Sequence, residues 1–202
     1  MTLQEFIRHY DFEGAIVLLE GKRNVPVVDQ EKLAELGRIL ALASKKMLFR
    51  SGNADGADHY FSAGVASVEK NRLQVIVPYA GHRSKTMQAY ESISLDTVNL
   101  AAESEVVYYS KHNNKNTRLI DQYLTGDVNR NSIKAAYIIR DTVKVIGTSS
   151  IKPASFGIFY DDLQNPKTGG TGHTMNVCQQ NNIPFINQNI WFDWIKSAQF
   201  FY

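Results

Sequence analysis

Three short apolar runs alternate with two amphipathic segments over residues 1–77. The runs are Gly14–Glu20, Lys46–Phe49 and Leu73–Val77, and continuous apolar runs of this length are typical of strands buried on both faces. Apolar residues recur at helical spacing between these runs, at Leu33, Leu36, Leu40 and Ala43 and at Ala57, Phe61, Val65 and Val68. A strand–helix–strand repeat implies right-handed crossovers between parallel strands. The sequence therefore predicts an α/β fold with a mainly parallel sheet flanked by helices.

The second half of the chain has a less regular pattern. We expect residues from about Thr86 to Ser104 to be mostly helical, and Asn113–Asn116 to form a turn. The further predicted elements are helices over Thr117–Leu124 and Ser132–Arg140, strands over Val143–Ile146, Ser155–Tyr160 and Ile183–Ile186, and a helix that carries Met175 and Cys178. A hairpin between the first two of these strands is one open alternative. The aromatic residues from Trp191 to Phe201 are predicted to pack on the domain or at a subunit contact.

Length, charge and hydropathy limit the class of protein. A chain of 202 residues without a repeat or a linker fits one domain over residues 1–202. The formal net charge is +2, with basic and acidic residues interspersed, so nucleic acid is not an expected partner. The N-terminus lacks a signal-peptide pattern, and no apolar stretch approaches the roughly 20 residues that span a bilayer. We expect a cytoplasmic protein without a membrane partner.

Two glycine-bearing segments carry the strongest functional signal. One is Arg-Ser-Gly-Asn-Ala-Asp-Gly-Ala-Asp over residues 50–58, and the other is Gly-Gly-Thr-Gly-His-Thr over residues 169–174. Each follows a predicted strand and opens a helix, which places it at the ligand-binding edge of a parallel sheet. Glycines allow close backbone approach, and N–H groups at a helix start attract anions. The sequence predicts a nucleotide or a related phosphorylated ligand there, although neither segment is a Walker or dinucleotide fingerprint.

Basic side chains follow two other predicted strands. Lys22 and Arg23 come after the first strand, and His82 and Arg83 come after the third. Each of them either adds positive charge around a bound phosphate or belongs to the solvated surface. Arg50, at the end of the second predicted strand, either faces the phosphate or pairs with a nearby carboxylate.

Polar side chains within the glycine segments are candidates for contact with the ligand. Ser51 and Asn53 offer hydrogen bonds to it. Asp55 and Asp58 lie where acidic residues often complement the dipole at a helix start, but Asp58 is also placed to bind ribose hydroxyls or to assist a leaving group. His173 is a candidate for binding phosphate or relaying a proton.

The sequence predicts neither a metal site nor a reactive thiol. The five histidines are scattered, and none has a cysteine or histidine at the spacing of metal ligands. Cys178 is the single cysteine and lies on the predicted core face of its helix, which favours inert packing. No cofactor is expected.

Several of these motifs, in this order, resemble the SLOG superfamily of Rossmann-like nucleotide-binding proteins. Residues 51–58 with Phe61 and Gly64 resemble its first glycine motif, which is similar to that of the DNA-processing protein A family. Arg130–Asn131 resembles an Arg-Asn pair before a late strand, and residues 169–174 followed by Ile183–Ile186 resemble the second glycine motif and final strand. The resemblance spans roughly residues 13 to 190. It implies a Rossmann-like three-layer fold.

The resemblance implies three alternative functions. The first is a sensor or binding module for a nucleotide-derived ligand, and such relatives often form homo-oligomers. The second is a hydrolase of the N-glycosidic bond, as in the cytokinin-activating phosphoribohydrolases. Those enzymes place a glutamate shortly after the second glycine motif, whereas Thr174–Val177 has none, so catalysis would fall to Asp55, Asp58 or Glu20 with His173. The third is binding of single-stranded DNA.

We take the first alternative as the expectation. The candidate ligand-binding residues are Lys22, Arg23, Arg50, Ser51, Gly52, Asn53, Gly56, Asp58, Arg83, Arg130, Asn131, Gly169, Gly170, Thr171, Gly172, His173 and Thr174.

Overall fold

The described strands form one sheet in which all the recorded pairings are parallel. The computed structural model describes residues 1–111, 114–126 and 130–198. Within them the sheet order is β4-β3-β2-β1-β5-β6. The strands are β1 (Ile16–Gly21), β2 (Leu48–Ser51), β3 (Leu73–Val77), β4 (Glu91–Ser94), β5 (Phe156–Tyr160) and β6 (Phe185–Asn187). The predicted α/β fold with a parallel sheet is confirmed.

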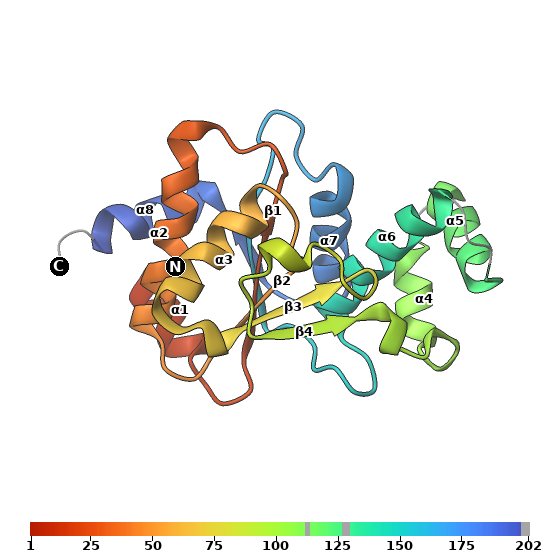
Figure 1. Cartoon of the computed structure of the whole chain (residues 1–202). Coiled ribbons are helices and arrows are strands. Elements are labelled where there is room, and N and C mark those ends of the chain that lie inside the picture. Colours follow the sequence, from red (N-terminus) through yellow and green to blue (C-terminus); the bar gives the residue numbers. More distant parts are fainter. Residues whose placement is uncertain (112–113, 127–129, 199–202) are drawn as a thin grey trace.

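Helices cover both faces of this sheet and give three layers (Figure 1). One face carries α1 (Leu3–Tyr10), α2 (Val27–Ala43), α3 (Ala57–Glu69) and α8 (Gln188–Ala198). The other face carries α4 (Ser104–Ser110), α5 (Asn114–Leu124), α6 (Arg130–Ile146) and α7 (Gly169–Gln180). Helices α4 and α5 pack on α6 and lie at the right of Figure 1, on the opposite side from α1 and α8. The architecture is that of a Rossmann-like fold.

Alternate residues of β1 enter different cores, as the two-residue period of a strand requires. Val17 and Leu19 pack on the side of α2 and α3, whereas Leu18 packs with residues of α7. Glu20 lies two residues after Leu18, so its side chain points to the same face of the sheet, and it is 4% exposed. The periodicity that buries Leu18 therefore also directs the Glu20 carboxylate toward α6 and α7.

The same periodicity buries Arg50, because β2 continues beyond the predicted strand end at Phe49. Its Nε donates to Gln74 Oε1 at 2.7 Å, and its Nη1 donates to the carbonyl oxygens of Lys144 at 3.0 Å and Lys152 at 2.8 Å. Burial lowers the pKa of this guanidinium to about 10, so it remains charged at neutral pH. Arg50 therefore joins β2 to the end of α6.

The N-terminal helix α1 and the residue after it contact β5, α8 and the segment that leads into β2. Phe6 is fully buried, with its ring centroid 5.0 Å from that of Phe156 and 5.1 Å from that of Trp194. Just after the helix, the Asp11 carboxylate accepts hydrogen bonds from the backbone N–H groups that precede β2, those of Lys45, Lys46 and Met47. These contacts make α1 part of the core.

Residues Val143–Ile146 form the last turn of α6, so the predicted strand and its hairpin with Ser155–Tyr160 are wrong. β-branched residues favour strands by local propensity, but this segment continues a helix whose apolar stripe packs on the sheet. Ile139 and Val143, one turn apart, are both fully buried in that contact. β5 instead pairs in parallel with β1 and β6.

Two other predicted elements differ from the structure. The segment Thr86–Ser104, expected to be mostly helical, contains β4 and short 3-10 turns at Leu95–Thr97 and Leu100–Ala102. β4 is a short edge strand with two serines and a glutamate, so it lacks an apolar run. Residues 114–116 begin α5 where a turn is predicted, and residue 113 lies outside the described residues.

The aromatic tail packs on the domain as far as it is described. Trp191 is fully buried and Trp194 is 3% exposed, while Phe200 and Phe201 lie outside the described residues. In the described parts of the chain, none of the helices combines the length and hydrophobicity that crossing a membrane requires.

Candidate functional site

A cavity of about 570 Å³ opens at the carboxyl ends of the central strands. β1 pairs with β2 on one side and with β5 on the other, so the loops after β1 and β5 run to opposite faces of the sheet. Such a switch point is where parallel α/β sheets bind ligands. The lining residues are Glu20, Gly21, Lys22, Arg23, Asn24, Ala54, Asp55, Asp58, Arg140, Asp141, Asp162, Gly170 and Thr171.

Asp58 holds the first glycine segment against the end of β1. Its Oδ2 accepts the backbone N–H of Gly52 at 3.1 Å and of Ala54 at 3.4 Å, and its Oδ1 accepts that of Gly21 at 3.3 Å. Only 1% of Asp58 is exposed. These bonds use two amides of the segment internally, so its backbone is less available to a ligand than the sequence suggests.

Arg140 connects the first glycine segment to α6. Its Nη1 donates to the Gly52 carbonyl oxygen at 2.7 Å, and its Nε and Nη2 donate to Asp141 Oδ1 at 3.1 and 2.7 Å. A Cβ on Gly52 would lie 2.8 Å from Arg140 Nη1, so a side chain there would displace the guanidinium. The guanidinium also lies over the Tyr137 ring, 5.2 Å from its centroid. A side chain at position 52 would therefore disturb the hydrogen bonds of Arg140.

A buried lysine joins two carboxylates in the floor of the cavity. Lys144 Nζ lies 2.5 Å from Glu20 Oε2 and 3.0 Å from Asp141 Oδ1, and its side chain is fully buried. Thr174 Oγ1, one turn inside α7, donates to Glu20 Oε1 at 2.9 Å. The cavity floor is therefore a single polar network shared by β1, α6 and α7.

The cavity floor holds the carboxyl groups of Glu20, Asp58 and Asp141. Two cations, Arg140 and Lys144, lie against them. Burial raises the pKa of Glu20 to about 7; Lys144 and Arg140 lower it, whereas Asp141 and Asp58 raise it. Burial would also raise the pKa of Asp141, but Arg140 and Lys144 hold it below its usual value. The network therefore keeps Asp141 ionised and leaves Glu20 as the group that exchanges a proton near neutral pH.

This raised pKa predicts that stability falls as pH rises from about 4.5 to 7. In that window the folded state binds more protons at Glu20 than the unfolded state, so the free energy of unfolding decreases with pH. Urea unfolding at several pH values should show this decline in the wild type and a flatter profile in Glu20→Gln. A control at an exposed glutamate of α2, Glu31→Gln, should retain the wild-type profile. Parallel profiles for wild type and Glu20→Gln would contradict the assignment.

The second glycine segment forms the first turns of α7 at the opposite wall of the cavity. Its Thr168 N-cap makes no side-chain capping bond, and no bond from the described residues reaches the N–H groups of Gly169, Gly170 and Thr171. A Cβ on Gly170 would lie 3.1 Å from Asp141 Oδ2. Gly172 has another reason to be glycine, because its Cβ would overlap the backbone of Lys167.

The structure brings some of the candidate residues together in the cavity and places others elsewhere. Those that line it are Lys22, Arg23, Asp55, Asp58, Gly170, Thr171 and Glu20. Asp55 is exposed, and its Oδ1 lies 2.7 Å from Arg83 Nη1. Asn53 donates to the backbone carbonyl oxygens of His82 and Arg83, at 3.3 and 3.4 Å. Arg83 and Asn53 thus support the rim without lining the cavity.

Other candidate residues do not line the cavity and make contacts that support the fold. Arg50 and the fully buried Ser51 lie in β2, away from the lining. His173 is 8% exposed, and its Nε2 lies 2.9 Å from Thr142 Oγ1. Gly56 has φ +80°, and a Cβ there would overlap Arg23, so this glycine serves the turn into α3.

The Arg-Asn pair lies at the wrong end of its helix for this site. Asn131 is exposed near the start of α6, and the side chain of Arg130 lies outside the described residues. The residues of α6 that line the cavity are Arg140 and Asp141, ten positions later. Because ten residues of α-helix span about 15 Å, the two pairs are well separated. No pattern in the sequence marks the second pair, because Thr142 and Lys144 interrupt the apolar residues that follow it.

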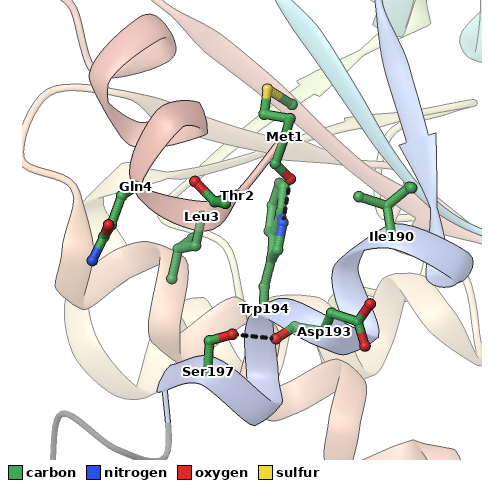
Figure 2. Close-up of a pocket in the computed structure, with 8 residues that line it drawn as sticks. All are labelled: Met1, Thr2, Leu3, Gln4, Ile190, Asp193, Trp194 and Ser197. Carbon is green, nitrogen blue, oxygen red and sulfur yellow. Dashed lines mark hydrogen bonds between the residues drawn. The ribbon is translucent and has the colours of Figure 1, made fainter.

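A second hollow, of about 470 Å³, lies between α1 and α8 (Figure 2). Its lining is more apolar, and Trp194 Nε1 donates to the Met1 carbonyl oxygen at 3.0 Å across it. Asp193 is the one carboxylate among its lining residues.

In the described ranges, no three histidine, cysteine or acidic side chains are grouped so that they could hold a metal ion. The cavity beside β1 is therefore the candidate site.

Comparison with known proteins gave no assignment: no protein-family model matches the chain, and no curated protein matches it.

Proposed function

We propose that this chain binds a phosphorylated nucleotide derivative in the cavity beside β1. The observation that carries the proposal is the meeting of two glycine segments, more than a hundred residues apart in sequence, at one cavity on the carboxyl edge of the sheet. Its volume of about 570 Å³ lies within the roughly 300–1,000 Å³ that small-molecule sites occupy. The resemblance to SLOG proteins is consistent with this ligand class.

The charges around the cavity favour one orientation of the ligand. Phosphate binds at the start of α7, where the N–H groups of Gly170 and Thr171 add to the positive end of the helix dipole. Lys22 and Arg23 supply further positive charge on the β1 side. The sugar then faces the carboxylate-rich floor, which would repel a phosphate.

A second candidate function is hydrolysis of the bond between the sugar and the base. The observation that favours it is Glu20, a carboxyl group in the cavity whose pKa is raised to about 7. A general acid is most effective when its pKa lies near the pH at which the enzyme works. Glu20 would protonate the departing base as its bond to the sugar carbon breaks, and the water that adds to this carbon would return a proton to the Glu20 carboxylate. Helix α7 has no carboxylate after its glycine segment, but the hydrogen bond from Thr174 holds the Glu20 carboxyl group of β1 beside this helix. Glu20 could therefore take the place of the glutamate that the phosphoribohydrolases have there.

One experiment separates the two functions. The chain is titrated with ribonucleoside monophosphates, ADP-ribose and NAD in a calorimeter, and the same samples are then analysed by chromatography. A binding module gives saturable heat and leaves the nucleotides intact. Release of free base or nicotinamide that Glu20→Gln abolishes would establish the hydrolase instead. Absence of saturable binding by every nucleotide would refute the proposed ligand class.

A further inference from the structure

One oxygen of the Asp141 carboxylate is open to the cavity. Its Oδ1 accepts Arg140 Nε and Nη2 and lies 3.0 Å from Lys144 Nζ, whereas Oδ2 accepts no hydrogen bond from the described residues. The side chain is only 5% exposed and lines the cavity. Because no donor from the described residues reaches this oxygen and it faces the cavity, a guest with a hydroxyl group can supply one.

Glu20 also has unused acceptor capacity beside it. Its Oε1 accepts from Thr174 and its Oε2 from Lys144, while an ionised carboxylate offers about four acceptor positions. The bridging Lys144 Nζ holds the two carboxylates next to each other. Two acceptors thus lie side by side in the floor, in fixed positions.

The second glycine segment leaves the approach to Asp141 open. A Cβ on Gly170 would come within 3.1 Å of Asp141 Oδ2 and would occupy the space in front of it. The uncapped start of α7, where we place the phosphate, belongs to the same wall. A single ligand could therefore place its anionic group at the start of α7 and its hydrogen-bond donors against the carboxylates of Asp141 and Glu20.

We propose that Asp141 Oδ2 and Glu20 accept hydrogen bonds from two adjacent sugar hydroxyls, so that the cavity selects nucleotides with free 2′ and 3′ hydroxyls. This specificity rests on the proposed nucleotide-binding function. A 2′-deoxy sugar lacks one of the two donors, so one carboxylate oxygen loses its hydrogen bond to the ligand. A 2′-phosphate places negative charge against both carboxylates. Ribonucleotides with an unmodified sugar are thus the proposed ligand class.

The test compares each ribonucleoside monophosphate with its 2′-deoxy and 3′-deoxy forms by calorimetry, starting from the tightest-binding base. Each deoxy form should bind about tenfold to a hundredfold more weakly, as expected for one lost hydrogen bond to a charged group. Equal affinities for ribo and deoxy forms would overturn the inference and leave nucleotide binding standing. Absence of binding by every ribonucleotide would overturn both.

A variant pair shows whether Asp141 is the selecting group. Asp141→Asn should weaken binding of the ribonucleotide and bring the ribo-to-deoxy affinity ratio close to one for one of the two deoxy forms, the one that lacks the hydroxyl bound by Asp141. The ratio is the informative readout, because a loss of folded protein lowers both affinities equally. Asp193→Asn, on the exposed surface of α8, should keep the wild-type ratio. An unchanged ratio in Asp141→Asn would refute the role assigned to this residue.

Discussion

Replacing Lys144 with methionine is expected to lower the free energy of unfolding by about 3–5 kcal/mol. Lys144 is fully buried, and its ammonium group lies against the carboxylates of Glu20 and Asp141. Methionine has a similar volume but no charge, so it leaves two buried carboxylates without their common partner. Urea-induced unfolding followed by circular dichroism measures the loss.

The matched control is Lys196→Met. Lys196 also pairs with a carboxylate, that of Asp193 at 2.9 Å, but both side chains are largely exposed, at 75% and 72%. Such surface pairs contribute about 1 kcal/mol or less. Equal unfolding midpoints for Lys144→Met and Lys196→Met would contradict the role of the buried network.

Replacing Gly170 with valine is expected to weaken nucleotide binding by about a hundredfold or more while the chain still folds. The valine side chain would occupy the space before Asp141 Oδ2 and obstruct the start of α7. Two hydrogen bonds to charged or dipolar groups, at about 1.5 kcal/mol each, correspond to a loss of that size. Calorimetric titration measures the affinity, and thermal unfolding confirms that the variant is folded.

Ser104→Val is the matched control for this variant. Ser104 is exposed and also lies in the first turn of a helix, α4, so valine has a comparable local effect there. Its nucleotide affinity should equal that of the wild type. Undiminished affinity in Gly170→Val would contradict the placement of the ligand between α7 and Asp141.

The fold was predictable wherever local pattern and tertiary role agree. β1, β3 and the helices between the first three strands have apolar residues at the spacing that their packing requires, so pattern alone identifies them. The end of α6 was not predictable in this way, because Val143 and Val145 resemble a strand and only packing on the sheet makes them helical. β4 carries too few apolar residues to signal a strand.

The sequence predicted which loops form the candidate site, but it did not predict which charged side chains lie in it. The glycine segments mark two walls of the cavity, and their position after strands follows from the topology. Arg50, at the end of an apolar run, reads as a group facing a ligand, yet the strand continues and buries it against α6. Arg140, Asp141 and Lys144 matter because of partners far away in sequence, and no local pattern reveals such partners.

The attachment of α1 to the rest of the protein has a practical consequence for protein engineering. Asp11 supplies acceptors for the amides that lead into β2, and Phe6 fills a space beside Phe156. Shortened versions made for crystallisation should therefore keep residues 3–11. Fluorescent labels or affinity tags are best attached through a long spacer, since the Met1 carbonyl oxygen already accepts the indole N–H of Trp194.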